Sequence, residues 1–171
     1  MEETNNLTNA MAEDDYNASD LPFDFVEDDT ETALICEPDA GIRAKLESAL
    51  KEIAYKATVA GSAREALKAM RFHLFNMVVV NEHFDPSTEG QNEVLNYLAK
   101  LPMSTRRQTF VVLVSDTHRT MDNMAAFNKS VNFILNSKNI DDAVTIFRKA
   151  IADNNAFYQV LKETFRAVGK I

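Results

Sequence analysis

The sequence predicts a doubly wound α/β domain with a five-stranded parallel sheet and an extended C-terminal helix. The first observation is an apolar run with three consecutive valines, Met77–Val80, which ends at Asn81. A second such run, Phe110–Val114, ends at Ser115. Runs of this kind are typical of strands buried on both faces, which occur in parallel sheets covered by helices. The third observation is that strand-like and helical patterns alternate five times, at about 25 residues per unit.

The first two units are marked by helix-start signals. Ala33–Cys36 is a short strand that stops before Pro38, which cannot donate to a ladder. Asp39 is suited to cap the next helix, whose inward face repeats at a period near 3.6 through Ile42, Leu46, Ala49, Leu50 and Ile53. The run from Tyr55 to Val59 predicts the second strand. Ser62–Glu65 forms a capping box, which opens a helix through Ala66, Leu67 and Met70.

The last three units follow the central strand. A loop over 82–89 leads to a helix with four inward residues, Val94, Leu95, Leu98 and Leu101. A short helix near 120–127 is expected to turn Met121, Met124 and Ala125 inward. Val131–Leu135 predicts the fifth strand, and Asn139 with Asp142 starts the last helix. Right-handed crossovers then favour the strand order 2-1-3-4-5 of flavodoxin-like folds.

The last helix is longer than the domain needs. Its apolar positions alternate four and three residues apart, as in a coiled coil, through Ile140, Val144, Phe147, Ile151, Asn154, Tyr158, Leu161, Phe165 and Val168. This seam is about 43 Å long at ~1.5 Å per residue, whereas five-residue strands span about 17 Å. The second half therefore needs a partner: a second copy, another protein, or its own domain after a bend at Asn154-Asn155. We expect a homodimer seam made of Tyr158, Leu161, Phe165 and Val168.

Charge divides the chain into regions. Residues 1–32 hold 11 acidic side chains and neither Lys nor Arg, which leaves 15 acids against 18 bases in the rest. We expect residues 1–32 to be a disordered acidic leader, in which the apolar cluster Leu21–Val26 is either solvated or a short docking segment. Residues 33–154 form the domain and residues 155–171 a helical extension. A near-neutral domain with an acidic tail gives no electrostatic case for nucleic acid.

Location and cofactors follow from what the sequence lacks. The single cysteine, Cys36, lies in an apolar run and fits a reducing cytoplasm. The longest apolar run is far shorter than the ~20 residues of a membrane span. The three histidines, His73, His83 and His118, show no ligand spacing, and there is no glycine-rich phosphate loop. We therefore expect a cytoplasmic protein without cofactor or metal.

The carboxyl ends of strands one, three, four and five should meet at one edge of the sheet. They present Glu37, Asn81, Ser115 and Asn136. The order Leu34–Asp39, Ile42-Arg43, Val78–Asn81 and Val112–Ser115 resembles a bacterial response-regulator receiver domain over about residues 33 to 153. The resemblance implies an aspartate at the end of strand three that accepts a phosphoryl group. It also implies two acids after strand one that help to hold Mg²⁺, a Ser or Thr after strand four, and a Lys after strand five.

Three of these positions depart from the family. Asn81 stands at the acceptor position, and an amide cannot form an acyl phosphate. Glu37-Pro38 replaces the pair of acids that helps to hold Mg²⁺, and Asn136 replaces the lysine. Only Ser115 keeps the family's residue type. These losses agree with one another and predict a pseudo-receiver without catalytic residues, which acts by protein–protein interaction in a two-component or related pathway.

Two alternatives remain open. The chain is an active receiver if Asp39, Glu82 or Asp85 serves as a displaced acceptor. The second alternative is a small enzyme of the same fold, but the sequence supplies no motif for one. For the partner surface, the resemblance points to the face made by the fourth helix, fifth strand and fifth helix. We expect that surface to include Arg119, Phe127, Lys129 and Phe133, although Phe133 fits a core position equally well.

Overall fold

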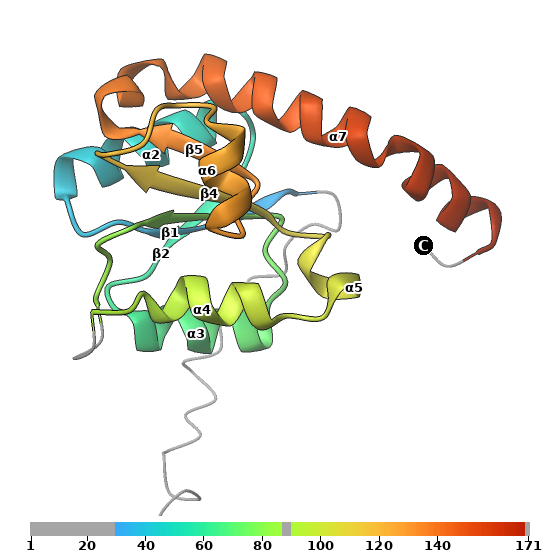
Figure 1. Ribbon diagram of the computed structural model, residues 1–171, viewed down its shortest axis with the longest axis horizontal. Helices are drawn as coiled ribbons and strands as arrows, with labels where there is room; N and C mark the ends of the chain where they lie inside the picture. Colours follow the sequence, from blue (N-terminus) through green and yellow to red (C-terminus); the bar gives the residue numbers. More distant parts are fainter. Residues whose placement is uncertain (1–29, 87–89, 170–171) are drawn as a thin grey trace, which may run out of the picture.

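The computed structural model describes residues 30–86 and 90–169, and its centre is a parallel sheet of five strands in the order β2-β1-β3-β4-β5 (Figure 1). The predicted fold class and strand order are confirmed. The strands are β1 (Thr32–Cys36), β2 (Lys56–Val59), β3 (Met77–Asn81), β4 (Phe110–Ser115) and β5 (Phe133–Asn136). Most of the predicted leader, residues 1–29 with the cluster Leu21–Val26, lies outside the described residues, as do residues 87–89 of the loop.

The three middle strands are buried on both faces. Along β3, Met77 and Val79 pack into one core, while Val78 and Val80 pack into the other. This alternation follows from the two-residue period of a strand. An uninterrupted apolar run therefore supplies both cores at once, which explains why β1, β3 and β4 lack a polar alternation. Cys36 is buried in the second core, and burial raises the pKa of its thiol to about 12.

Helices cover the two faces of the sheet (Figure 1). The first core is closed by α2 (Ala40–Glu52) and α7 (Ala143–Ala167), through residues that include Leu46, Leu50 and Phe147. The second core is closed by α3 (Ala63–Phe72), α4 (Glu93–Lys100) and α6 (Asn123–Asn128). A short helix that the sequence analysis missed, α5 (Met103–Arg106), connects α4 to β4. No helix in the described part of the chain is long and apolar enough to cross a membrane.

The helix caps predicted at Asp39 and Ser62 are present. The Asp39 carboxylate accepts a hydrogen bond from the Ile42 N–H at 2.8 Å. The Ser62 hydroxyl accepts one from the Glu65 N–H at 3.2 Å. The return bond of the capping box is shifted by one residue, because the Glu65 carboxylate accepts from the Gly61 N–H at 2.8 Å. Each cap satisfies backbone N–H groups that have no partner within the helix.

The segment around α6 corrects the sequence analysis. Met121 and Met124 were predicted to point inward, but they are 42% and 70% exposed. The helix begins later, because the Asp122 carboxylate caps it by accepting from the Ala125 N–H at 3.0 Å. Met121 precedes this cap with a φ of 65°, outside any helix. The inward side of α6 is consequently carried by Ala126, with the predicted Ala125 partly buried against the same core.

The start of the last helix also differs. The residues predicted to begin it, Asn139 and Asp142, lie instead in a 3₁₀ helix, η2 (Ser137–Asp142). The Asn136 side chain caps η2 by accepting from the Lys138 N–H at 2.9 Å. The α-helix α7 then follows from Ala143, and its N-cap residue Asp142 makes no side-chain capping bond.

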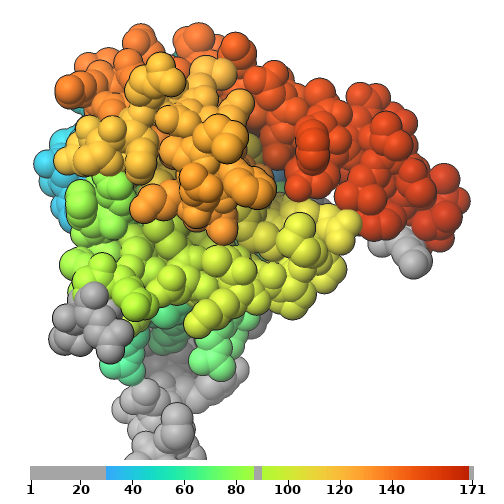
Figure 2. Space-filling view, viewed as in Figure 1, coloured from blue at the N-terminus to red at the C-terminus, as the bar shows by residue number. Residues whose placement is uncertain are grey.

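The helix α7 continues without a break to Ala167, past Asn154 and Asn155, so the alternative of a bend at these residues is wrong. Figure 2 shows its second half extending away from the body of the domain. In that half Tyr158, Leu161 and Phe165 are partly buried, and Val168 is 59% exposed. The Arg107 guanidinium lies 5.9 Å from the centre of the Phe165 ring. One side of the predicted seam therefore contacts the chain's own residues next to α5.

Candidate functional site

The carboxyl ends of the strands place the predicted site residues along one edge. In the register of the sheet Cys36 pairs with Val80, Asn81 with Val114, and Ser115 with Asn136. Glu37 follows Cys36 directly, so it comes next to Asn81 at the end of the neighbouring strand. This edge is where ligands bind in open α/β sheets.

Glu37 and Asn81 form a buried hydrogen-bonded pair. The Asn81 amide Nδ2 donates to both carboxylate oxygens of Glu37, at 3.1 Å to Oε1 and 2.9 Å to Oε2. The Asp39 N–H donates to Oε1 as well, at 3.0 Å. Glu37 is 1% exposed. Burial raises the pKa of its carboxyl above the ordinary value, and the hydrogen bonds from Asn81 and Asp39 oppose this rise.

The other polar atoms of Asn81 are engaged too. Its side-chain oxygen accepts from the His83 N–H at 2.8 Å. Its backbone carbonyl accepts from the Asn92 side chain at 3.0 Å, and Asn92 itself caps α4. Because the Asn81 amide both donates to Glu37 and accepts from His83, its orientation is fixed. The predicted acceptor position is thus filled by a side chain whose donors and acceptor already have partners.

Ser115 is held by Glu82, which follows the end of the neighbouring strand β3. Ser115 is 1% exposed, and its Oγ donates to Glu82 Oε1 at 2.8 Å. The Asp116 N–H donates to the same oxygen at 3.2 Å. Ser115 Oγ in turn accepts from the N–H groups of Thr117 and His118, at 3.2 and 3.1 Å. The hydroxyl therefore fastens the β4 loop to the residue that follows Asn81.

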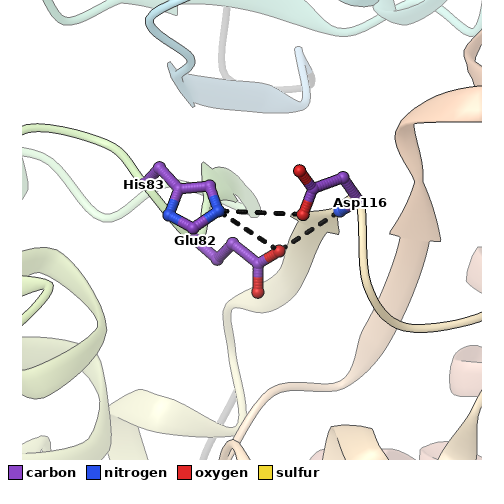
Figure 3. Close-up of side chains that lie close together, drawn as sticks. All are labelled: Glu82, His83 and Asp116. Atoms are coloured by element: carbon purple, nitrogen blue, oxygen red, sulfur yellow. Dashed lines mark hydrogen bonds and ion pairs between the residues drawn. The ribbon is translucent and has the colours of Figure 1, made fainter.

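Glu82, His83 and Asp116 gather at this edge (Figure 3). The His83 Nε2 lies 3.7 Å from Glu82 Oε1 and 3.7 Å from Asp116 Oδ1. The pKa of Asp116 is lowered, first by hydrogen bonding with Glu82 and further by His83. These are ligand types that transition metals accept, but His83 and Asp116 are largely exposed, and such groups are common without an ion. We assign no metal here.

The sequence analysis missed this cluster because it searched for ligands by their spacing along the chain. The available signal was topological. Glu82 and His83 follow the end of β3, Asp116 follows the end of β4, and these two strands are neighbours in the sheet. Residues at the ends of adjacent parallel strands come together whatever their separation in sequence.

Asn136 and Pro38, the remaining predicted positions, have structural roles. The Asn136 side chain donates to the His118 carbonyl at 2.7 Å, in addition to capping η2. It thereby ties β5 to the loop after β4. Pro38 is exposed in the turn between β1 and α2. The structure thus joins Glu37 to Asn81 and Ser115 to Glu82, while the contacts of Asn136 run to His118 and Lys138.

The predicted partner surface needs one correction. Arg119, Phe127 and Lys129 are exposed, and Phe127 is exposed by 78%. Phe133 is only 7% exposed and belongs to the core closed by α2 and α7, where its ring lies 6.4 Å from that of Phe110. It cannot be a surface residue, because the first position of β5 points into the sheet's covered face. Of the two readings of Phe133, the core position is the one observed.

Comparisons with solved structures identify the fold. The chain is similar to a response regulator from Thermotoga maritima, with 18% identity and a TM-score of 0.55 over 72% of this chain and 98% of that one. It is similar to a response regulator receiver domain protein from Methanospirillum hungatei, with 18% identity and a TM-score of 0.55 over 74% and 97%. A signal receiver domain of an HD domain-containing protein from Pseudomonas fluorescens matches with 16% identity and a TM-score of 0.55 over 74% and 98%.

These similarities extend over nearly the whole of each receiver domain, so the chain has the receiver fold. No protein-family model matches the sequence, and no curated protein matches it. The class is therefore defined by the fold, and the function has to be argued from the residues at the strand ends.

Proposed function

We propose that this chain is a cytoplasmic receiver-like signalling module that acts by binding proteins, without phosphorylation, in a two-component or related pathway. One observation carries the proposal. At the position that the resemblance predicts for the phosphoryl acceptor stands Asn81, whose amide donates to both carboxylate oxygens of the buried Glu37.

The chemistry of this pair supports a site that needs no phosphoryl group. A receiver's phosphoryl acceptor is a carboxylate nucleophile, and the neutral amide of Asn81 does not replace it. Hard divalent cations prefer several carboxylate or carbonyl oxygens, whereas here the amide's N–H groups face the single buried carboxylate. A cation in an acidic site stabilises buried negative charge. The Asn81 amide does part of this for Glu37, because it supplies hydrogen-bond donors to a buried negative group.

The alternative of a displaced acceptor is less well supported, because each of the three candidates already has a structural role. Asp39 caps α2. Glu82 accepts from Ser115 and Asp116. Asp85 accepts from the Ala63 N–H at 2.7 Å and so secures the start of α3. Phosphorylation of any of them would break a hydrogen bond that holds a helix or a loop.

Incubation with acetyl phosphate and Mg²⁺ tests the proposal. We expect the intact mass, measured by mass spectrometry after quenching, to show no added phosphoryl group while an active receiver domain in the same tube is labelled. Labelling of this chain would contradict the proposal. Loss of that labelling in Asp39→Ala, Glu82→Ala or Asp85→Ala would then identify the displaced acceptor.

We further propose that the module binds its partner through the surface that contains Arg119, Phe127 and Lys129. Phe127 is the strongest candidate for an anchor, because it is an aromatic side chain exposed by 78%, two residues before the exposed Lys129. Aromatic and arginine side chains are enriched among the residues that dominate binding energy in protein interfaces.

Self-association through the second half of α7 is the second part of the proposal. Beside the predicted seam, Phe157 and Val160 are exposed by 79% and 74%, and the seam residue Val168 is exposed by 59%. Together with the partly buried Leu161 they form a broad apolar side along about three turns of helix. A second copy of the helix would cover that side.

Sedimentation velocity of the full chain across a range of concentrations tests self-association. We expect a dimer, and we expect the double variant Val160→Asp/Val168→Asp to weaken it by at least about 100-fold, because each buried valine stabilises the interface by ~1.5 kcal/mol. Met124→Asp, which changes an equally exposed residue on α6, should leave the dimer intact. A monomer at every concentration would contradict self-association.

A further inference from the structure

An apolar hollow lies between α3, α4 and the segment around α5, at the edge of the sheet where the strands begin. It is therefore at the opposite end of the strands from Asn81. Its walls are mainly the side chains of Met70, Leu74, Phe75, Tyr97, Leu98 and Leu101. In Figure 1, α3 and α4 form the layer below the sheet, with α5 beside them.

The rim of this hollow is both apolar and basic. The wall residue Leu74 is 47% exposed, and the wall residue His73 beside it in the chain is exposed as well. Arg71 is exposed and follows the wall residue Met70 in the chain, and Lys100 is exposed in the last turn of α4, directly before the wall residue Leu101. The acids of these helices, Glu65 and Glu93, lie in the first turns, away from the hollow. The rim thus suits a partner that combines apolar and acidic side chains.

The chain enters the fold next to this hollow. The Thr32 N–H donates to the Asn76 side chain at 2.9 Å, and the Thr32 hydroxyl lies 2.9 Å from the His73 Nε2. His73 is itself a wall residue of the hollow. The first residue of the chain that the structure describes, Thr30, therefore lies two residues from a contact with the rim.

The residues that precede Thr30 have the matching composition. Leu21, Phe23, Phe25 and Val26 form an apolar cluster, and residues 1–32 carry 11 acids without a Lys or Arg. Val26 and Leu21 are four and nine residues before Thr30, which corresponds to a maximal reach of about 14 to 32 Å at ~3.5 Å per residue. The cluster can therefore reach the hollow while its acids face the basic rim.

We propose that the segment Leu21–Val26 docks into the hollow between α3, α4 and α5 of its own chain. Its aromatic and aliphatic side chains cover Leu74 and Tyr97, and Asp20, Asp24 and Glu27 face Arg71 and Lys100. The short connection favours the intramolecular contact, because it gives the segment a high effective concentration at the hollow. The fold then carries an internal ligand at the edge opposite the candidate site.

A tryptophan at position 23 tests this, because the chain contains no tryptophan of its own. In the full chain carrying Phe23→Trp, we expect fluorescence emission at a shorter wavelength than in urea, since the indole is buried. Leu74→Arg or Tyr97→Arg, each at a wall residue of the hollow, should move the emission in that background to the solvated wavelength. Met124→Arg should not, although Met124 is more exposed than Leu74.

Three further measurements decide the interpretation. A tryptophan placed outside the cluster by Met11→Trp should emit at the solvated wavelength, which shows that burial is confined to the cluster. Circular dichroism identifies a rim variant that fails to fold, and the other rim variant then carries the test. Solvated emission from the Phe23→Trp chain, or burial of its indole that persists in both folded rim variants, would overturn the proposal. Burial that appears only as concentration rises would also overturn it, because the occupant would then be a second copy.

Discussion

Replacement of Asn81 by aspartate should destabilise the fold by about 2–4 kcal/mol at pH 7, because a second carboxylate then faces a buried one. At present the Asn81 amide donates two hydrogen bonds to Glu37, which is 1% exposed. In Asn81→Asp both bonds are lost and two like charges lie within hydrogen-bonding distance. Urea denaturation at pH 7 measures the loss.

The pH dependence of this effect has a definite sign. The pKa of Glu37 is raised above its ordinary value of 4.5, so between pH 4.5 and the raised pKa the folded state holds a proton that the unfolded state has already lost. The contribution of Glu37 to folding stability is therefore greatest below pH 4.5, and it falls as the pH rises through the raised pKa of the folded state. The second carboxylate raises the pKa of the pair further. The gap in stability between Asn81→Asp and the parent chain should thus shrink in acid.

Asn123→Asp is the matched control for Asn81→Asp. It makes the same isosteric change on an exposed residue, in the first turn of α6, where a negative charge is tolerated. Its effect on the free energy of unfolding should stay within about 0.5 kcal/mol at all pH values. Equal stability of Asn81→Asp and the parent chain at pH 7 would contradict the role that we assign to the buried pair.

The second large effect is expected for Phe147→Ala, which should lower the free energy of unfolding by about 3–5 kcal/mol. Phe147 is 0% exposed and belongs to the part of α7 that closes the core over α2 and the sheet. Its removal leaves a cavity that the close-packed neighbours cannot fill. The measurement is the free energy of unfolding in urea at a protein concentration where the chain is monomeric.

Phe157→Ala, on the same helix, provides the control. Phe157 is 79% exposed, so its truncation should change the free energy of unfolding of the monomer by no more than about 0.5 kcal/mol. The contrast separates a first half of α7 that holds the domain together from a second half that is available for binding. Similar losses in the two variants would show that the second half is packed as firmly as the first.

The fold was predictable from the sequence because its strongest signals are local and periodic. The valine run of β3 and the 3.6-residue period of α2 both arise from burial, and they survive without knowledge of the tertiary contacts. The errors fell where elements are short. In α6, six residues long, the position of the Asp122 cap decides which side chains face inward, and no periodicity could reveal that Met124 faces water.

The places of the site residues in the fold were predictable from the sequence, but their hydrogen-bond partners were not. Strand order alone brings Glu37 and Asn81 to neighbouring strand ends, so their proximity could be inferred. Which acid would hold Ser115 depends on side-chain directions in the loop after β3, where Glu82 turns toward β4. Phe133 illustrates the same limit, because the resemblance to receiver domains gives its position on β5 but not whether its ring is covered.

The most direct test of the central claim is a ¹⁹F NMR titration of the full chain with beryllium fluoride and Mg²⁺, using an active receiver domain as the positive control. Beryllium fluoride imitates a phosphoryl group on a carboxylate, and its bound fluorides give resonances separate from the free species. Because Asn81 offers an amide that already donates to Glu37, we expect no bound resonance at any Mg²⁺ concentration. A bound resonance that requires Mg²⁺ and disappears in a variant of a residue at the end of β3 would contradict the account.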